Sequence, residues 1–305
     1  MTTRTQQIAA EINRSQKRLS KVIAITNQKG GVGKTSTTFN FAHYLNELGY
    51  RVAVVDLDGQ GNLTELFFEP AVLNQYVHTA AVQFFTEEMN EFTPLSHPCG
   101  IDVIATQRNS HVLTNVDTQS IDAASLFYEN VSRLAEDYDF VVLDTPPAPG
   151  IRTTAACASA DYIFAPVLVD TFAISALEGV VNSVHAIGGL LDTELKLNGI
   201  LINQLQDSTE ETKHDYAELA AAIGEPLIPT AVRLSKPFRR AMRLGVPVWH
   251  LRSSGSEQRT SKEARKAYGE MSSRITEIPK KRIKAFNDYS RVVRMGLAQP
   301  EAQSQ

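Results

Sequence analysis

The sequence predicts an α/β fold, a doubly wound and mostly parallel sheet with helices on both faces. Short, uninterrupted apolar runs are typical of strands that are covered on both sides. These runs alternate along the chain with segments in which apolar residues recur at helical spacing, an order typical of parallel strands joined by helices. At 305 residues, with 43% hydrophobic and 21% charged residues, the chain is long and apolar enough for a sizeable core.

The first apolar run, 22–26, leads through a glycine-rich turn into a helix expected over 35–48, which Gly49 ends. Further strands are expected at the later apolar runs, 52–55, 101–105, 139–143, 162–168 and 198–202. Helical spacing predicts helices at 120–136, 172–191, 211–223 and 257–275. Residues 70–98 carry little pattern, which is typical of a mobile insertion, so we expect one there.

Composition argues against several classes of protein. Because no run of about 18 apolar residues is present, no transmembrane helix is expected. The first 20 residues lack the apolar region of a secretory signal. Two cysteines, Cys99 and Cys157, are too few for a disulfide framework or a four-cysteine metal site. We therefore expect a cytoplasmic protein.

The net charge of −4 conceals a strong asymmetry along the chain. Residues 1–21 carry a net charge of +4, residues 22–232 carry −19, and residues 233–294 carry +12. A basic segment on an acidic protein is typical of a chain that binds a polyanion, although solvated helix faces give the same composition.

The glycine-rich turn has the composition of a phosphate-binding loop, and it follows an expected strand and opens an expected helix. Glycines let backbone N–H groups close around phosphate oxygens, and the helix N-terminus adds positive potential. In such a loop Lys34 contacts phosphates and the Thr35 hydroxyl binds Mg²⁺. The residues of the loop are Asn27, Gln28, Lys29, Gly30, Gly31, Val32, Gly33, Lys34, Thr35 and Ser36.

The loop departs from the general phosphate-loop pattern at its first position, where Gln28 replaces glycine. The dinucleotide-binding pattern is a poorer match, because it fails at Ser36 and has no use for the Lys-Thr pair. A tight turn without a ligand is the remaining alternative. Lys29 is unusual, because two lysines at one site repel unless a polyphosphate lies between them or one points away. Lys29 therefore either reaches a phosphate, in the same subunit or another, or is solvated.

Carboxylates follow two of the expected strands. Asp56 and Asp58 end the run at 52–55, and Asp144 ends the run at 139–143. The carboxyl ends of parallel strands face the ligand crevice, so these acids are expected near the phosphates. Asp56 and Asp144 are candidate ligands of Mg²⁺ or its waters, and Asp58 is a candidate for positioning an attacking water. Alternatives for Asp58 are a ribose contact and a helix cap.

Together these motifs resemble the deviant-Walker-A ATPases of the ParA/MinD group, and within it the ParA/Soj-type partition ATPases. The similarity covers about residues 21–275. The matching residues are those of the loop, then Asp56, Asp58, Gln60, Gly61 and Asn62, then Asp144, Thr145, Pro146 and Pro147, then Leu177, Glu178 and Gly179, and finally Ile228, Pro229, Val232, Arg233, Leu234 and Ser235.

The resemblance implies a P-loop NTPase fold in which two subunits sandwich two molecules of ATP with Mg²⁺. It implies that Lys29 is the signature lysine, which crosses to the ATP of the partner. Lys34 and Thr35 then match the phosphate and metal contacts, and Asp58 the residue that positions water. The implied roles of the remaining residues are Walker B carboxylate for Asp144 and adenine contact for Asn203.

The resemblance also implies a function. In this family the ATP-bound homodimer coats double-stranded DNA without sequence specificity, and a centromere-binding, ParB-like adaptor stimulates a weak ATPase. The expected function is plasmid or chromosome partition by a cytoplasmic, nucleoid-associated protein. Gly59 stands where the family often has proline, and Pro149 lies after the Walker B prolines. The arm at 1–20 is too short for a helix-turn-helix domain.

The basic segment supplies candidate DNA contacts. On a helix from Ser235, four cations share one face, which suits binding to phosphates without base readout. A second basic cluster lies on the helix expected at 257–275. The candidate DNA-binding residues are Arg233, Lys236, Arg239, Arg240, Arg243, Lys262, Arg265 and Lys266. Few aromatic residues accompany them, so stacking on single strands is not favoured.

We expect three segments: a short basic arm at 1–20, a single ATPase domain at 21–278 with a basic surface over 233–275, and a basic tail at 279–305. Three other functions remain open. Apolar residues of the tail allow a MinD-like membrane-positioning ATPase, although a membrane partner is disfavoured because the apolar face is thin. Nucleoid-based positioning of a protein cargo, and a module that binds ATP without cleaving it, are the others.

Overall fold

The computed structural model describes residues 20–170, 173–190, 194–205, 209–251 and 254–276. The expected basic tail lies outside the described residues, as does the expected arm except for Ser20. None of the helices in the described parts of the chain is long and apolar enough to cross a membrane.

Seven strands form one sheet in the order β3-β4-β2-β5-β1-β6-β7. All neighbouring strands are parallel except β3 and β4, which are antiparallel. The α/β fold with a mostly parallel sheet is therefore confirmed. The strands are Lys21–Ile25 (β1), Val52–Asp56 (β2), Leu95–Ser96 (β3), Ile101–Ile104 (β4), Phe140–Asp144 (β5), Tyr162–Val167 (β6) and Leu197–Ile202 (β7).

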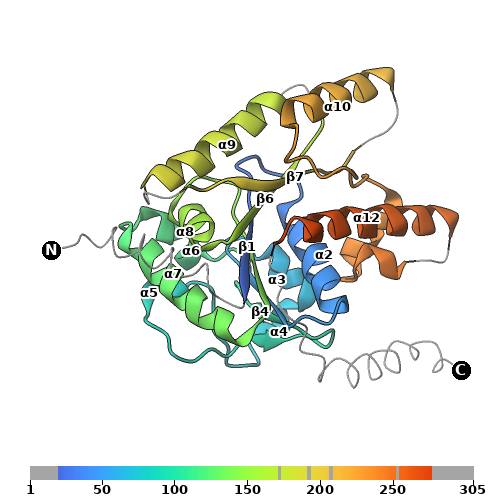
Figure 1. Cartoon of the computed structure of the whole chain (residues 1–305). Coiled ribbons are helices and arrows are strands. Elements are labelled where there is room, and N and C mark those ends of the chain that lie inside the picture. The colour runs from blue at the N-terminus through green and yellow to red at the C-terminus, as the bar shows by residue number, and fades with distance from the viewer. Residues whose placement is uncertain (1–19, 171–172, 191–193, 206–208, 252–253, 277–305) are drawn as a thin grey trace, which may run out of the picture.

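Helices cover both faces of this sheet (Figure 1). One face carries α2 (Lys34–Glu47), α3 (Asn62–Phe67), α11 (Lys236–Arg243) and α12 (Gly255–Ser273). The other carries α5 (Gln83–Thr86), α7 (Asp122–Leu134) and α8 (Ile151–Ser159). α9 (Ala173–Leu190) and α10 (Glu210–Ile223) pack around β7. The short elements are α4 (Pro70–Leu73), α6 (His111–Thr114) and the 3₁₀ turns η1 (Asn115–Thr118), η2 (Ala135–Asp137) and η3 (Val248–His250).

The continuous apolar runs of the strands supply both halves of the core, because successive side chains point to opposite faces. In β2, Val52 and Val54 pack on the α2 side, whereas Ala53 and Val55 pack on the α7 side. This burial on both faces explains why the strands read as uninterrupted apolar segments in the sequence.

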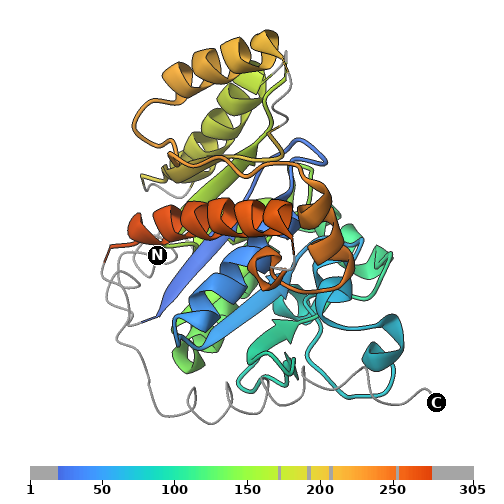
Figure 2. The same cartoon turned by 90° about the vertical axis from the view of Figure 1, so that its right-hand side faces the viewer.

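The C-terminal helices are tied to α2, across which α12 lies (Figure 2). The Glu47 carboxylate of α2 accepts hydrogen bonds from Trp249 Nε1 at 2.7 Å and from Arg265 Nη1 at 2.9 Å. Nearer the start of α2, Asn40 Oδ1 accepts from Val248 N at 3.1 Å, and its Nδ2 contacts Met242 Sδ at 3.4 Å. The basic segment is thus attached to the helix that follows the glycine-rich loop.

Both edges of the sheet are short or covered. At one edge, β3 has only two residues, with Pro94 directly before it and Pro98 shortly after it. At the other, the segment 226–234 runs along β7: Ile228 N donates to Ile200 O at 2.9 Å and Val232 N to Ile202 O at 2.9 Å.

The prediction of a mobile insertion over 70–98 is wrong. Phe84 and Phe85 of α5 are buried against the α7 side of the core, where Phe85 stacks on Phe127 with ring centroids 4.6 Å apart. The segment returns to the sheet as β3. Its elements span only two to four residues each, too short to show a helical or strand period in the sequence.

Candidate active site

The glycine-rich loop joins β1 to α2 and has the backbone that a phosphate cradle needs. Gly31 and Gly33 adopt left-handed conformations, with φ of 74° and 90°. A Cβ at position 33 would lie 2.0 Å from Asn203 Nδ2, so only glycine fits there. Because α2 begins at Lys34, directly after the loop, the positive end of its dipole points at the same place.

A cavity of about 580 Å³ opens beside the loop, a volume within the range of small-molecule sites. It brings together most of the predicted phosphate contacts and Asp58, together with Pro147 of the loop after β5. The lining residues contributed by the predicted loop are Gly30, Gly31, Gly33, Lys34, Thr35 and Ser36. Val32 is buried and supports the loop from behind.

Lys34 places its ammonium group inside the loop. Its side chain is buried, and Nζ donates to the Lys29 carbonyl at 3.3 Å. Burial lowers the pKa of Lys34, while the nearby carboxylates of Asp144 and Asp58 oppose this shift. A cation held among backbone groups is poised to contact an anion, since it has little water to lose on binding.

Thr35 and Asp144 meet as the sequence predicts. Thr35 Oγ1 donates to Asp144 Oδ2 at 2.7 Å, and Thr38 Oγ1 donates to Asp144 Oδ1 at 3.1 Å. Asp144 is fully buried, and this burial raises its pKa to about 7, although its hydrogen bonds and Lys34 act in the opposite direction. A hydroxyl and a carboxylate in contact are oxygen donors of the kind Mg²⁺ prefers, so these residues fit that ion.

Asp56 lies deeper than predicted. It pairs with Asp144 across β2 and β5, but its carboxylate accepts from Thr64 N at 2.9 Å and Thr64 Oγ1 at 2.8 Å, at the start of α3. Burial, with Asp144 adding to it, raises the pKa of Asp56 to about 8. Asp56 does not line the cavity, so the structure gives it a role in holding α3 and the loop that carries Asp58.

Asp58 does line the cavity, together with residues of the glycine-rich loop. Its side chain is partly exposed, and Oδ1 accepts from Gln60 N at 3.0 Å. The structure thus separates two carboxylates that are neighbours in the sequence: Asp56 turns into the core and Asp58 faces the cavity.

Lys29 does not line the cavity. Its ammonium group forms an ion pair with Asp170 of the same chain. Asp170 follows β6 and precedes α9. Both side chains are about one third exposed, with relative exposures of 34% and 36%. The contact lies at the surface, where an ion pair is readily exchanged for another.

Asn203 sits directly behind the loop. Its Nδ2 donates to Val32 O at 2.8 Å, whereas its Oδ1 is buried without a hydrogen-bond partner among the described residues. The next residue, Gln204, donates from Nε2 to Gly31 O at 2.7 Å. Gln204 also lines a second, more apolar cavity of about 620 Å³, which shares Met242 with the first.

The basic residues divide into two groups. On α11, Pro237, Phe238 and Ala241 are buried, which leaves Lys236, Arg239 and Arg243 exposed and without an ion-pair partner among the described residues. Lys262 on α12 is likewise exposed. The others form ion pairs: Arg240 with Glu257 at 2.9 Å, Arg265 with Glu47 at 2.9 Å, Lys266 with Glu270 at 3.7 Å and Arg233 with Glu263 at 3.2 Å.

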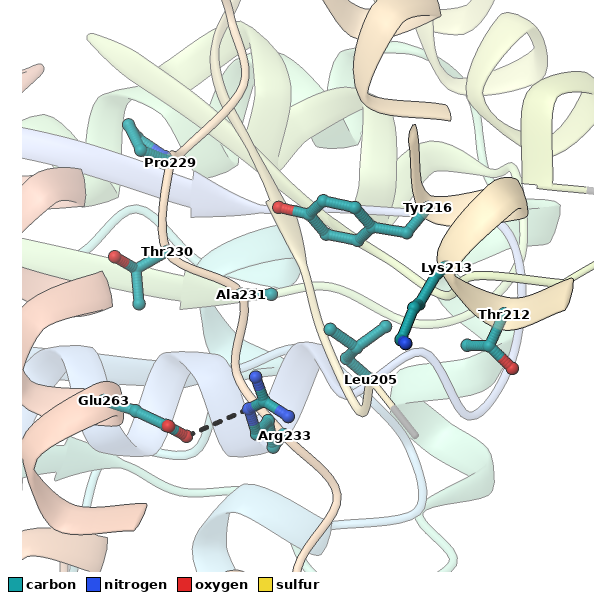
Figure 3. A pocket seen from close by; sticks show the side chains of 9 residues that line it. All are labelled: Leu205, Thr212, Lys213, Tyr216, Pro229, Thr230, Ala231, Arg233 and Glu263. Atoms are coloured by element: carbon teal, nitrogen blue, oxygen red, sulfur yellow. Dashed lines mark ion pairs between the residues drawn. The ribbon is translucent and has the colours of Figure 1, made fainter. Parts of the chain in front are cut away.

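Arg233 precedes α11 and lines a different cavity from Lys236, Arg239 and Arg243. It lines a hollow of about 380 Å³ between α10, the segment after β7 and α12, together with Tyr216 and Lys213. Figure 3 shows its ion pair with Glu263 at the lower side of this hollow. The structure therefore does not join Arg233 to the row of α11 cations.

Sequence reasoning missed several supporting residues. Thr38 donates a hydrogen bond to Asp144, and Thr64 donates one to Asp56. Asn40 contacts Met242 of α11. The spacing of Thr38, one turn after Lys34 on the same helix, is the only signal in the sequence that points to any of them.

Comparison with known proteins identifies the family and the fold. A family model described as "AAA domain" matches residues 20–197. The chain is 31% identical over 248 residues to Protein IncC of Escherichia coli, covering 80% of this chain and 67% of that one. It is 31% identical over 251 residues to sporulation initiation inhibitor protein Soj of Bacillus subtilis, covering 78% and 95%. A putative plasmid partition protein of Borrelia burgdorferi, solved with AMPPNP, has the same fold, with a TM-score of 0.68, 19% identity and coverage of 84% and 100%.

Proposed function

This chain belongs to the ParA/Soj-type family of P-loop partition ATPases, and from that membership we propose that it hydrolyses ATP to drive DNA partition. The reaction is weak and is stimulated by a centromere-binding, ParB-like adaptor. The active form is an ATP-sandwich homodimer that binds double-stranded DNA without sequence specificity, in the cytoplasm on the nucleoid. The observation that carries the proposal is one cavity lined by Lys34, Thr35 and Asp58.

The residues of the cavity suit the binding of Mg²⁺-ATP. The backbone N–H groups of the loop from Gly30 to Ser36 cradle the phosphates, and Lys34 neutralises their charge. Thr35 and Asp144 would hold a magnesium ion here, because their side-chain oxygens are in contact. When bound, Mg²⁺ supplies further neutralisation of phosphate charge.

Asp58 is the proposed residue that orients the attacking water. Its Oδ1 accepts from the Gln60 backbone, which leaves the other oxygen to accept from a water on the cavity side. Asp56, expected from the sequence as a second metal residue, is set behind Asp144 in this proposal: its carboxylate bonds Thr64 and the Asp58 amide, whereas Asp144 contacts Thr35.

Asn203 is the proposed adenine contact. Its unpaired Oδ1 is an acceptor at the end of β7, and the more apolar cavity beside Gln204 has room for a base. In the same proposal Lys29 leaves Asp170 when two subunits meet and contacts the ATP of the partner.

The proposed DNA contacts are first of all the exposed cations of α11 and α12 that form no ion pair within the described parts of the chain: Lys236, Arg239, Arg243 and Lys262. The paired residues Arg240, Arg265, Lys266 and Arg233 contribute less in this proposal, because each already neutralises a carboxylate. Such contacts recognise phosphates and not bases.

Steady-state ATP hydrolysis tests the enzymatic part of the proposal. We expect slow turnover with Mg²⁺ that DNA increases, and turnover at background level for Lys34→Ala. The matched control is Lys213→Ala, which removes an exposed lysine of α10 outside the cavity and leaves turnover unchanged. Equal turnover in the wild-type protein and in Lys34→Ala would show that this cavity does not hydrolyse ATP.

A further inference from the structure

An ion pair between the buried Arg152 and the half-buried Asp117 has no part in binding nucleotide as proposed above. Arg152 is the second residue of α8, and Asp117 lies in η1. Their side chains are 5% and 21% exposed. An arginine so deeply buried is rare unless it is fully bonded, and its bonds show what it holds.

Nearly all donors of Arg152 are directed at two acceptors. The Asp117 carboxylate accepts from the backbone N of Arg152 at 3.1 Å, from Nε at 3.1 Å and from Nη2 at 2.6 Å. Nη1 donates to the Leu57 carbonyl at 3.0 Å. Because Arg152 is buried and each of its three guanidinium nitrogens donates to Asp117 or Leu57, it is not directed at a phosphate.

The Leu57 carbonyl belongs to the peptide that leads into Asp58. Leu57 is fully buried, and its own N donates to Asp144 O at 3.0 Å. Beyond Asp58, the Gly59 carbonyl accepts from Ser110 N at 2.7 Å. The backbone on both sides of Asp58 is therefore bonded to the rest of the molecule, and Arg152 supplies the contact to a positively charged side chain.

Two glycines make this arrangement possible. A Cβ at Gly150 would lie 2.5 Å from the Asp117 carboxyl carbon, and a Cβ at Gly59 would lie 2.4 Å from Thr114 Oγ1. A side chain at position 150 would collide with Asp117, and one at position 59 would collide with Thr114 of α6. The close approach explains why glycine, and not the proline common in the family, suits position 59 here.

We infer that Arg152 and Asp117 are positioning residues for Asp58, a clamp that fixes the backbone of residues 57–60 so that the Asp58 carboxylate stays directed at the attacking water. This inference rests on the proposed ATPase function. A charge-assisted, multiply bonded arginine holds a backbone more firmly than a neutral contact. Displacement of a water-positioning group by about 1 Å can cost about 100-fold in rate.

Backbone hydrogen exchange tests the clamp without reference to turnover. In Arg152→Met, amides of residues 57–61 should exchange at least ~10-fold faster than in the wild-type protein. The matched control is Arg133→Met, because Arg133 similarly donates to a loop carbonyl, Met89 O at 3.0 Å, and to Glu88 at 2.8 Å, but on the far end of α7. Unchanged exchange at 57–61 in Arg152→Met would overturn the inference.

Turnover then tests the consequence. Arg152→Met should lower kcat at least ~10-fold and change KM for ATP by less than about twofold, because the phosphate contacts stay in place. Should the unpaired carboxylate unfold that variant, Arg152→Met with Asp117→Leu removes both charges and should give the same kcat. Arg133→Met should keep the wild-type kcat.

A double-mutant comparison separates positioning from general damage. In an Asp58→Ala background, Arg152→Met should leave the residual turnover unchanged, because the group that it positions is already absent. An equal fold loss with and without Asp58 would overturn the inference. Absence of turnover in the wild-type protein would instead refute the proposed function, with the exchange measurement still deciding the clamp.

Discussion

Gly33 and Asn203 illustrate what the sequence conveys about single residues and what it leaves out. Motif spacing was sufficient to predict that Lys34, Thr35 and Asp144 meet, because strand–loop–helix geometry fixes their separation. It did not predict that the Asn203 side chain fills the space which Gly33 leaves open, or that Thr64 donates a hydrogen bond to the Asp56 carboxylate. Those contacts depend on how distant segments pack, which local pattern does not encode.

His43 carries a prediction about acid stability. It is fully buried on α2, where burial lowers its pKa to about 3, with nearby His250 and His97 adding to the effect and Glu47 opposing it. Since the folded pKa lies below the ordinary value, protonation favours the unfolded chain. The contribution of neutral His43 to the free energy of unfolding is complete above about pH 6.5, and it is lost as the pH falls towards 3.

Between pH 7.5 and 5.0, we expect the free energy of unfolding to fall by about 2 kcal/mol more in the wild-type protein than in His43→Phe. The figure follows from a loss of about 1.4 kcal/mol for each pH unit below 6.5. Phenylalanine suits the site because His43 Nε2 has no hydrogen-bond partner among the described residues and the ring packs on Phe39 and Phe67. Urea unfolding at the two pH values measures the difference. His214→Asn, at an exposed position of α10, should behave as wild type; identical pH dependence in His43→Phe would contradict the prediction.

At the scale of elements, the strands were the most predictable part. Six of the seven were expected from apolar runs, within one or two residues of their bounds. β3 and α5 were missed because they are too short to show a period, and α8, which carries Arg152, because its small residues give no clear apolar stripe. The helix from Ser235 was expected, and Ser235 does cap it, accepting from Phe238 N at 3.2 Å.

The exposed face of α11 carries the second prediction. Changing Lys236, Arg239 and Arg243 together to alanine should remove up to three phosphate contacts and reduce the slope of log affinity against log salt by about 2.7. The expected reason is that these cations have no carboxylate partner among the described residues. Fluorescence anisotropy with random-sequence duplex DNA, from 50 to 200 mM salt, measures the slope.

The matched control for α11 is Arg240→Ala with Lys266→Ala, two cations that already form ion pairs. It should lower the slope by less than about one. If the control variant loses as much affinity as the α11 variant, ion pairing does not decide which cations reach DNA.

At the scale of the whole molecule, the sequence predicted one sheet with a ligand crevice at its carboxyl edge, and the structure has the cavity there. The division of charge also has a spatial meaning. The basic helices are attached to α2 through Asn40 and Glu47, so the helix that begins at the phosphate loop also supports the proposed DNA surface. Charge counting could locate that surface along the chain but not against α2.

Dimerisation gives the third prediction. Lys29→Ala should bind ATP with nearly wild-type affinity but stay monomeric, because the proposed contact of this lysine is to the nucleotide of the partner. Multi-angle light scattering with Mg²⁺ and a non-hydrolysable ATP analogue measures the mass. Lys196→Ala, an exposed lysine before β7, should dimerise as the wild-type protein does. A dimer of unchanged stability in Lys29→Ala would remove the proposed role in the partner's site.

The protected edges of the sheet bear on how such a protein tolerates crowding. A partition protein of the proposed kind accumulates at high local density along DNA, where exposed strand edges would invite cross-β aggregation. Here one edge ends in a two-residue strand near prolines, and the other is already bonded to the segment 226–234. This protection lowers the risk that copies of the chain packed side by side join edge to edge into fibrils.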